Sequence, residues 1–419
     1  MNSNTFLKRF GLNPNDFNAA SAEPVTTDDG YLYLLEQDNS KIPCPACNSN
    51  HIVIKDYYYK DINCSESIHI KDIFRIKTPR FKCKDCNKTF TKPLSNIEEN
   101  RSISNKTIQM ICADFHVTKT FSEIADRYHV STATVINIFD NDIATPNRLS
   151  LPEVLCIDEF YFSKDKDNKY CVVLVDWKTK KVIDILQNRK LPYLREYFSK
   201  IDSKELKKVK YFVSDLYDGY RTIHKEFFNK AHHIADFYHI TVQLIRPINI
   251  IRTTVMKSLN VDSIEYKFMK KNWSYFLRRL EKVPESKIFK TRSGLEEPVF
   301  DIFMKCVKID VVLWNGYDCL QDLFKFQKDR YYEDSVNDFK FLIKKLRKSQ
   351  NKYLDDVANT YEKWLIEIGN AYSLHKGFKD ISNSISECSN NQIKTIIKVA
   401  YGYQNFERFR KRVLLLLWD

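Results

Sequence analysis

The sequence predicts an α/β protein of several domains. Its main sheet, with flanking helices, is interrupted by an α-helical insertion and preceded by two small modules. Three observations lead to this prediction. Apolar runs of strand length alternate with helical patterns over residues 150–258. Two Cys-x-x-Cys pairs lie near the N-terminus, and a helical pattern rich in aromatic and lysine residues fills most of 259–378. The chain has 419 residues, which exceeds the roughly 100–200 residues of one typical domain.

The charge balance predicts a partner of negative charge. The formal net charge is +13, and basic residues cluster at 204–210, 267–282, 340–352 and 408–412. Nucleic acid is the commonest polyanion that such a surface attracts, although a basic protein without that role has the same composition. No stretch approaches the roughly 20 apolar residues of a membrane span, and the N-terminus lacks the apolar core of a signal peptide. We therefore expect a cytoplasmic protein, associated with the nucleoid when it binds DNA.

Residues 1–40 form an N-terminal segment whose role the sequence does not indicate, and residues 41–95 predict a zinc ribbon. Two strand-like runs, 51–62 and 67–80, lie between the two Cys-x-x-Cys pairs, and Phe90 is placed to pack against them. Each pair puts two thiolates on one tight turn, and four sulfurs complete a tetrahedral zinc site. In a chain without export signals, this spacing favours metal ligands over disulfides or four unrelated cysteines. The expected ligands are Cys44, Cys47, Cys83 and Cys86.

Residues 100–145 predict a helix-turn-helix domain. Apolar residues from Phe121 to Tyr128 line one helical face, and Ser131 is placed to cap a second helix that packs back through Val135 and Phe139. Three polar residues near the start of that second helix are then expected to point outward, where base edges are usually read. An ordinary helical hairpin is the alternative. The expected DNA-binding residues are Thr132, Thr134 and Asn137.

Residues 150–258 predict the first part of a catalytic domain with an RNase-H-like sheet. The pattern gives three strands, a helix, a strand, a helix, a strand and a helix. Asp158 lies within the first strand and Asp215 at the end of the fourth, and these strands are neighbours in such a sheet. Two adjacent carboxylates can hold divalent ions for phosphoryl transfer. Taken alone, Asp158 could instead be an edge-strand residue paired with a surface lysine.

A third carboxylate is expected late in the chain. Residues 259–378 predict the helical insertion, and 379–419 the last part of the catalytic domain, where Glu387 falls in the first turn of a helix. Glu362 and Glu367 are its rivals, but their pattern predicts the solvent face of an amphipathic helix. Asn390 and Asn391, just after Glu387, are small polar residues that would let DNA approach the helix start.

These motifs together resemble the ISL-three family of bacterial insertion-sequence transposases, from about residue 43 to 417. The resemblance rests on IDEF at Ile157–Phe160, SDLYDGY at Ser214–Tyr220, ADFYHI at Ala235–Ile240, E-x-x-N-N-x-I-K from Glu387 and YGYxNFxxFRxR from Tyr401. It implies an RNase-H-like DDE domain in which Asp158, Asp215 and Glu387 bind Mg²⁺ or Mn²⁺. Glu159 and Asp218 lie beside these motif residues, either as supporting groups or as ordinary satisfied polar residues. For His239 the expected roles are contact with DNA, a contact that holds Asp236, or again an ordinary satisfied polar residue.

The function that follows is that of a DNA transposase. It would recognise the terminal inverted repeats of an insertion sequence and cleave and transfer DNA strands with divalent metal ions. The class implies double-stranded DNA as partner, both as transposon ends and as target, and a homodimer on that DNA. Two alternatives remain open: a transposase-derived DNA-binding regulator, and an RNase-H-like structure-specific DNA nuclease.

Overall fold

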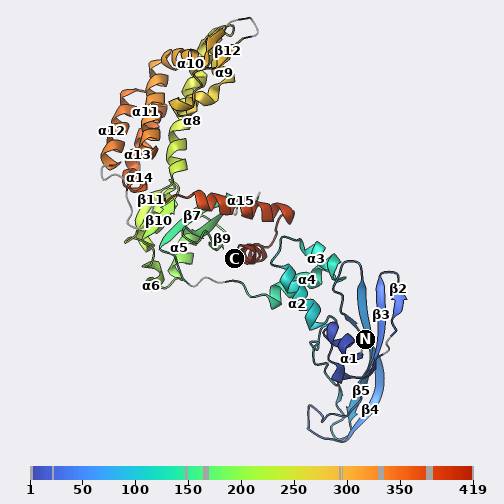
Figure 1. Cartoon of the computed structure of the whole chain (residues 1–419). Helices are drawn as coiled ribbons and strands as arrows, with labels where there is room; N and C mark the ends of the chain where they lie inside the picture. Colours follow the sequence, from blue (N-terminus) through green and yellow to red (C-terminus); the bar gives the residue numbers. More distant parts are fainter. Residues whose placement is uncertain are drawn as a thin grey trace. The chain divides into compact units, whose positions relative to one another are not determined.

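The computed structural model describes residues 3–20, 23–146, 150–163, 169–291, 294, 296–328, 335–373 and 381–417. The chain divides into two compact units (Figure 1). The first comprises Met1–Pro146 with Ile393–Asp419, and the second comprises Asn147–Gln392.

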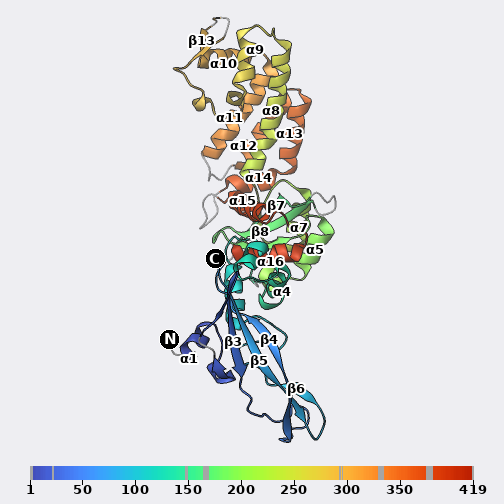
Figure 2. The ribbon, with the colours of Figure 1, turned by 90° about the vertical axis from the view of Figure 1, so that its right-hand side faces the viewer.

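A mixed sheet forms the body of the first unit. Its described strands are β1 (Phe17–Ala20), β2 (Val25–Thr27), β3 (Gly30–Gln37), β4 (Ile52–Asn63), β5 (Lys71–Cys83) and β6 (Thr89–Thr91). The order is β1-β3-β5-β4, with β2 beside β3 and β6 beside β5. The long antiparallel pair β4 and β5 (Figure 2) confirms the two strands predicted between the cysteine pairs. Residues 1–40, whose role the sequence left open, contribute three strands to the same sheet.

Short helices close one face of this sheet. They are α1 (Ser3–Arg9) and the 3-10 helix η1 (Pro14–Asp16). Phe10 of the turn after α1 packs on Tyr33 and Phe74, whose rings stack with 4.5 Å between centroids. Alternating burial along β3 and β5 directs these aromatic residues to one side of the sheet.

Three helices follow the sheet and include the predicted helix pair: α2 (Asn105–Asp114), α3 (Phe121–Arg127) and α4 (Thr132–Asp142). Thr120 and Glu123 form a reciprocal capping box at the start of α3, and Ser131 caps α4 as predicted. His129, with φ of 52°, makes the sharp turn between the two helices. Ile124, Tyr128, Val135 and Phe139 are buried between the helices, as their spacing predicts.

The last helix of the chain, α16 (Phe406–Leu416), packs on these three helices. Arg412 is 2% exposed, and its guanidinium donates to the carbonyl oxygens of Phe115, Val117 and Lys119 at 2.6–2.9 Å. Arg408 forms an ion pair with Asp140 of α4 at 2.7 Å. Helix α16 therefore supplies the hydrogen-bond donors for backbone carbonyl groups between α2 and α3.

The second unit is built on a five-stranded sheet. Its described strands are β7 (Val154–Tyr161), β8 (Tyr170–Asp176), β9 (Val182–Leu186), β10 (Tyr211–Ser214) and β11 (His232–Ala235). The order is β11-β10-β7-β8-β9, in which β7, β8 and β9 are antiparallel neighbours and β10 runs parallel to β7 and β11. This mixed sheet fits an RNase-H-like domain, and β7 and β10 are neighbours as predicted.

Helices cover one face of the sheet through apolar side chains. They are α5 (Leu191–Ser199), α6 (Ser203–Leu206) and α7 (Asp218–Phe227). Leu155 and Ile157 of β7 share a buried cluster with Leu194 and Phe198 of α5 and Ile223 of α7. Because successive residues of a strand point to opposite faces, Asp158 lies on the face away from this cluster.

Helices make up most of the insertion (Figure 2). Helix α8 (Phe237–Ser258) leaves the end of β11 and contacts α11 and α13. The other described helices and strands are α9 (Ile264–Lys271), η2 (Trp273–Leu277), η3 (Leu280–Lys282), β12 (Ile288–Lys290), β13 (Glu296–Pro298), α10 (Val299–Lys308), α11 (Val311–Lys328), α12 (Ser335–Lys348), α13 (Lys352–Lys363) and α14 (Leu365–Tyr372). The chain then returns to the sheet with α15 (Ser384–Val399).

Replacing Arg412 tests the attachment of α16. Arg412→Ala leaves three carbonyl oxygens without their charged donor, and hydrogen bonds to charged groups contribute about 1.5–3 kcal/mol each. We expect the unfolding temperature of the first unit to fall clearly in a thermal melt. The control is Glu407→Ala, an exposed residue of the same helix, which should leave the melt unchanged. Equal melts for both variants would contradict the role assigned to Arg412.

Candidate active site and metal centre

Asp158 lies on β7, the middle strand of the five-stranded sheet, and is held there by two hydrogen bonds. Its Oδ1 accepts from the Glu159 backbone N–H at 2.8 Å, and its Oδ2 accepts from Asn390 Nδ2 at 2.9 Å. Burial raises the pKa of Asp158 to about 7, and the nearby charge of Asp215 acts in the same direction. A bound cation would compensate the cost of ionising this carboxylate.

Asp215 follows directly after β10, beside Asp158. The parallel register pairs Val213 with Cys156, so Asp158, two residues further along β7, is next to Asp215, which lies just beyond the end of β10. Burial raises the pKa of Asp215 to about 6. Its Oδ1 is buried and has no hydrogen-bond partner in the described structure. An unpartnered, buried carboxylate oxygen is unfavourable unless a cation binds it, so the donor set fits a hard divalent metal.

Glu387 lies in the first turn of α15 and is exposed. Together with Asp158 it lines a cavity of about 380 Å³. Asp158 is thus close to Asp215 and shares this cavity with Glu387, whereas Asp215 is not among the residues that line the cavity. Among the described residues, only the four cysteines place three or more ligand atoms within 4.8 Å of one another.

Two asparagines position the start of α15 against β7. Asn383 Nδ2 donates to the Ile157 carbonyl oxygen at 3.3 Å, and Asn390 Nδ2 donates to Asp158. Asn390 is buried, so the prediction that it forms an open surface for DNA is wrong. Asn390 lies three residues after Glu387, so both side chains lie near one helix face. This spacing is the feature of the sequence from which the position of Asn390 at the site could have been predicted.

The acidic residues near Asp158 and Asp215 in the sequence, Glu159 and Asp218, form ion pairs with basic side chains of the protein. Arg189 contacts both carboxylate oxygens of Glu159, the longer distance being 2.8 Å, and stacks over the Tyr170 and Tyr217 rings. Asp218 forms an ion pair with Lys363 at 2.6 Å. Both are thus satisfied polar residues in this structure.

The structure separates the two rivals of Glu387. Glu362 is exposed and paired with Arg347, as its pattern predicts. Glu367 is not on the solvent face: it is 6% exposed and accepts two hydrogen bonds from Arg221 at 2.7 and 3.0 Å. The prediction failed there because α14 packs against β11, a contact that the helical pattern does not reveal.

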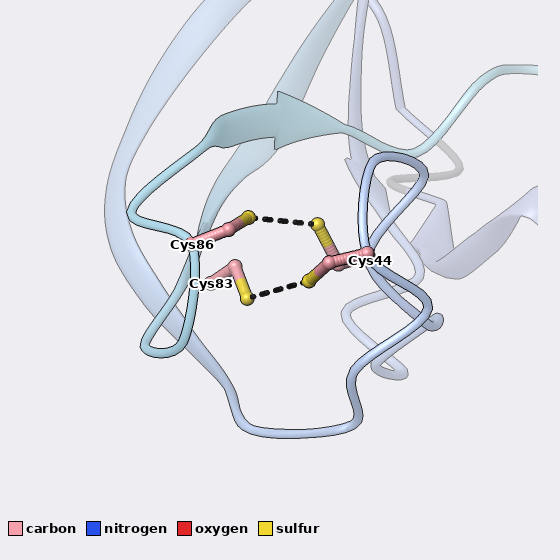
Figure 3. A group of neighbouring side chains, drawn as sticks. Cys44, Cys83 and Cys86 are labelled. Atoms are coloured by element: carbon pink, nitrogen blue, oxygen red, sulfur yellow. Dashed lines mark hydrogen bonds between the residues drawn. The ribbon is translucent and has the colours of Figure 1, made fainter.

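The four cysteines of the first unit form one compact group (Figure 3). The sulfur of Cys44 lies 3.5 Å from that of Cys86, and Cys47 lies 3.6 Å from Cys83. Tetrahedral zinc with Zn–S bonds of about 2.3 Å requires sulfurs about 3.8 Å apart, so the spacing fits the ion. Phe90 packs beside the group, as predicted.

The two cysteine turns share one backbone conformation. Asn48 and Asn87, each one residue past a pair, have φ of 58° and 60°. The Cys86 and Asp85 backbone N–H groups donate to the Cys83 sulfur and lower the pKa of that thiol. The Ala46 and Cys47 N–H groups donate likewise to Cys44. Burial opposes its ionisation, but the hydrogen bonds prevail and its pKa falls to about 7. The first thiol of each turn is thus favoured as the thiolate that zinc requires. For Cys47 the Ser49 N–H acts in the same direction, but hydrogen bonds with Cys86 and Cys83 and burial prevail and raise its pKa to about 12.

On α4, the candidate DNA-reading residues differ in orientation. Thr132 and Asn137 are exposed. Thr134 is half-buried, and its hydroxyl bonds to that of the capping Ser131 at 2.8 Å. A hydroxyl at this position joins the helix cap because it lies three residues after Ser131.

Residues 155–413 match the model of a family described as Transposase, of the ISL-three DDE type. A protein of Lactococcus lactis subsp. lactis named ATP-dependent protease is 30% identical over 115 residues, which are 27% of this chain and 34% of that protein. The chain thus spans about a third of that relative's length. Within the described ranges, no helix combines the length and apolar character that a membrane span requires.

Zinc analysis of purified protein tests the metal centre. We expect one zinc ion per chain and its loss in Cys83→Ser, because three thiolates and a hydroxyl hold zinc far more weakly. Cys388→Ser is the matched control, since Cys388 is an exposed cysteine outside the group. A Cys83→Ser protein that keeps its full zinc content would contradict the assignment.

Proposed function

Because this chain belongs to the ISL-three family of DDE transposases, enzymes of DNA phosphoryl transfer, we propose that it cuts and joins the ends of an insertion sequence. Asp158, Asp215 and Glu387 would be its catalytic carboxylates. The observation that carries this assignment is the pair of half-buried aspartates on neighbouring strands, one with an unpartnered oxygen.

Asp158, Asp215 and Glu387 would hold two Mg²⁺ or Mn²⁺ ions. When bound, such ions stabilise charge on the reacting phosphate and lower the pKa of an attacking hydroxyl. The chain's own contribution is orientation. Asn390 fixes one oxygen of Asp158, and Arg189 keeps Glu159 away from the ligand set. The hydroxyl of a water, and then a freed 3′-hydroxyl, would attack phosphorus in line.

The first unit would recognise DNA. Helix α4 presents Thr132 and Asn137 on its exposed side, and the zinc ribbon precedes it in the same unit. We propose that these elements bind the terminal inverted repeats, with α4 in the major groove. Pairing of two ends requires two active sites, so a homodimer on DNA is part of the proposal.

The two alternatives predict different activities. A DNA-binding regulator descended from a transposase would bind the ends without metal-dependent nicking. A structure-specific nuclease would cut branched junctions without requiring the terminal repeats. The carboxylate pair and the exposed face of α4 favour the transposase over both.

Replacing Glu387 tests the catalytic assignment. Glu387→Gln should keep fold and DNA affinity but lose Mg²⁺-dependent strand cleavage by several orders of magnitude, because a metal ligand acts mainly on the transition state. Glu362→Gln, on an exposed glutamate of α13, should cleave normally. Cleavage is measured on DNA carrying the element's ends. Normal cleavage by the Glu387 variant would remove this residue from the site.

Replacing Asn137 tests end recognition. Asn137→Ala should lower the preference for terminal-repeat DNA over random duplex, because one good base contact provides about 1–3 kcal/mol of discrimination. Affinities for both duplexes are compared at equal salt concentration. An equal loss of affinity for both duplexes would mean that Asn137 contacts the DNA backbone instead of the bases.

A further inference from the structure

Asp236 is a buried carboxylate that the proposed metal site does not use. It follows directly after β11 and caps α8. Its Oδ1 accepts from the Asn383 backbone N–H at 3.0 Å, and its Oδ2 accepts from His239 Nδ1 at 3.1 Å. Both oxygens are therefore engaged, and Asp236 fixes the His239 ring beside the start of α15.

The contact with Asp236 determines what each nitrogen of His239 can do. An ionised carboxylate only accepts hydrogen bonds, so Nδ1 must be the donor. In the neutral ring, Nε2 then carries the lone pair. The His239 side chain lines the cavity that also contains Asp158 and Glu387, and it is 37% exposed. A hydroxyl that enters this cavity can therefore meet a hydrogen-bond acceptor already oriented by the protein.

We propose that His239 is a further catalytic residue, a role that rests on the proposed function. Its Nε2 accepts the proton of the attacking hydroxyl. As the nucleophile's O–H bond breaks, its oxygen forms a bond to phosphorus and the bond from phosphorus to the leaving 3′-oxygen breaks. The leaving oxygen takes a proton from water, and His239 then releases its proton to solvent. No oxidant or other reactant is required.

The carboxylates around the cavity are less suited than His239 to accept the proton of the attacking hydroxyl. Asp158 and Glu387 would be metal ligands, and Glu159 is held by Arg189. Asp236 already accepts hydrogen bonds on both oxygens. Among the described residues that line the cavity, His239 combines a fixed orientation with a ring nitrogen left for the substrate.

Single-turnover cleavage of DNA carrying the element's ends tests this proposal. His239→Ala should slow cleavage by about 10²- to 10⁴-fold, the usual contribution of a positioned base, while DNA affinity and the thermal melt stay unchanged. Added imidazole should restore part of the rate by supplying the missing base. His232→Ala is the control, because His232 is exposed at the opposite end of β11.

Two further variants keep the test decisive. His239→Gln retains an amide that can donate to Asp236 but cannot take a proton, so it should be as slow as His239→Ala. Asp236→Asn keeps a good helix cap and should also slow cleavage, because the amide no longer fixes the ring tautomer.

A His239→Ala or His239→Gln enzyme that cleaves at the wild-type rate would overturn the role of His239. So would a folded His239→Ala enzyme whose rate imidazole does not raise. If the wild-type protein itself lacks metal-dependent cleavage, the proposed function fails instead, which separates the two claims.

Discussion

The proposed active site depends on one hydrogen bond, from Asn390 Nδ2 to Asp158 Oδ2, at 2.9 Å. It joins β7, near the start of the second unit, to α15, which follows the long insertion in the sequence. Together with the hydrogen bond from Asn383 to the carbonyl oxygen of Ile157, the residue before Asp158, it fixes the helix turn that carries Glu387. The end of the insertion therefore returns these two asparagines to β7.

The second constraint is electrostatic. Burial raises the pKa values of Asp158 and Asp215, and the two carboxylates also repel each other. In the absence of a cation, this arrangement costs stability, and a divalent metal would offset the cost. Glu159 and Asp236 avoid the same conflict because Arg189 and His239 bind them. In the described structure Asp158 accepts hydrogen bonds from neutral groups and Asp215 Oδ1 has no partner, so a divalent ion would supply the compensating charge.

Features encoded by local pattern could be predicted from the sequence. Apolar runs predicted β7 to β11, and the Cys-x-x-Cys spacing predicted that the four cysteines would form one group. The capping role of Ser131 followed from its position before α4. Long-range contacts could not be predicted in this way. Glu367 has the spacing of an exposed helical residue, yet Arg221, 146 positions away, binds it in the interior. Likewise, nothing near Arg412 in the sequence indicates that it satisfies three carbonyl groups around residue 117.

The central claim is that Asp158, Asp215 and Glu387 together hold the divalent metal ions of one active site, and iron-directed backbone cleavage tests it most directly. Fe²⁺ replaces Mg²⁺ in the zinc-loaded protein, and ascorbate with peroxide then generates radicals that cut the chain beside the bound iron. Mass spectrometry of the fragments should locate cuts near residues 158, 215 and 387, and excess Mg²⁺ should suppress all three together. Cuts that omit any of these three segments, or that Mg²⁺ does not suppress, would contradict the account.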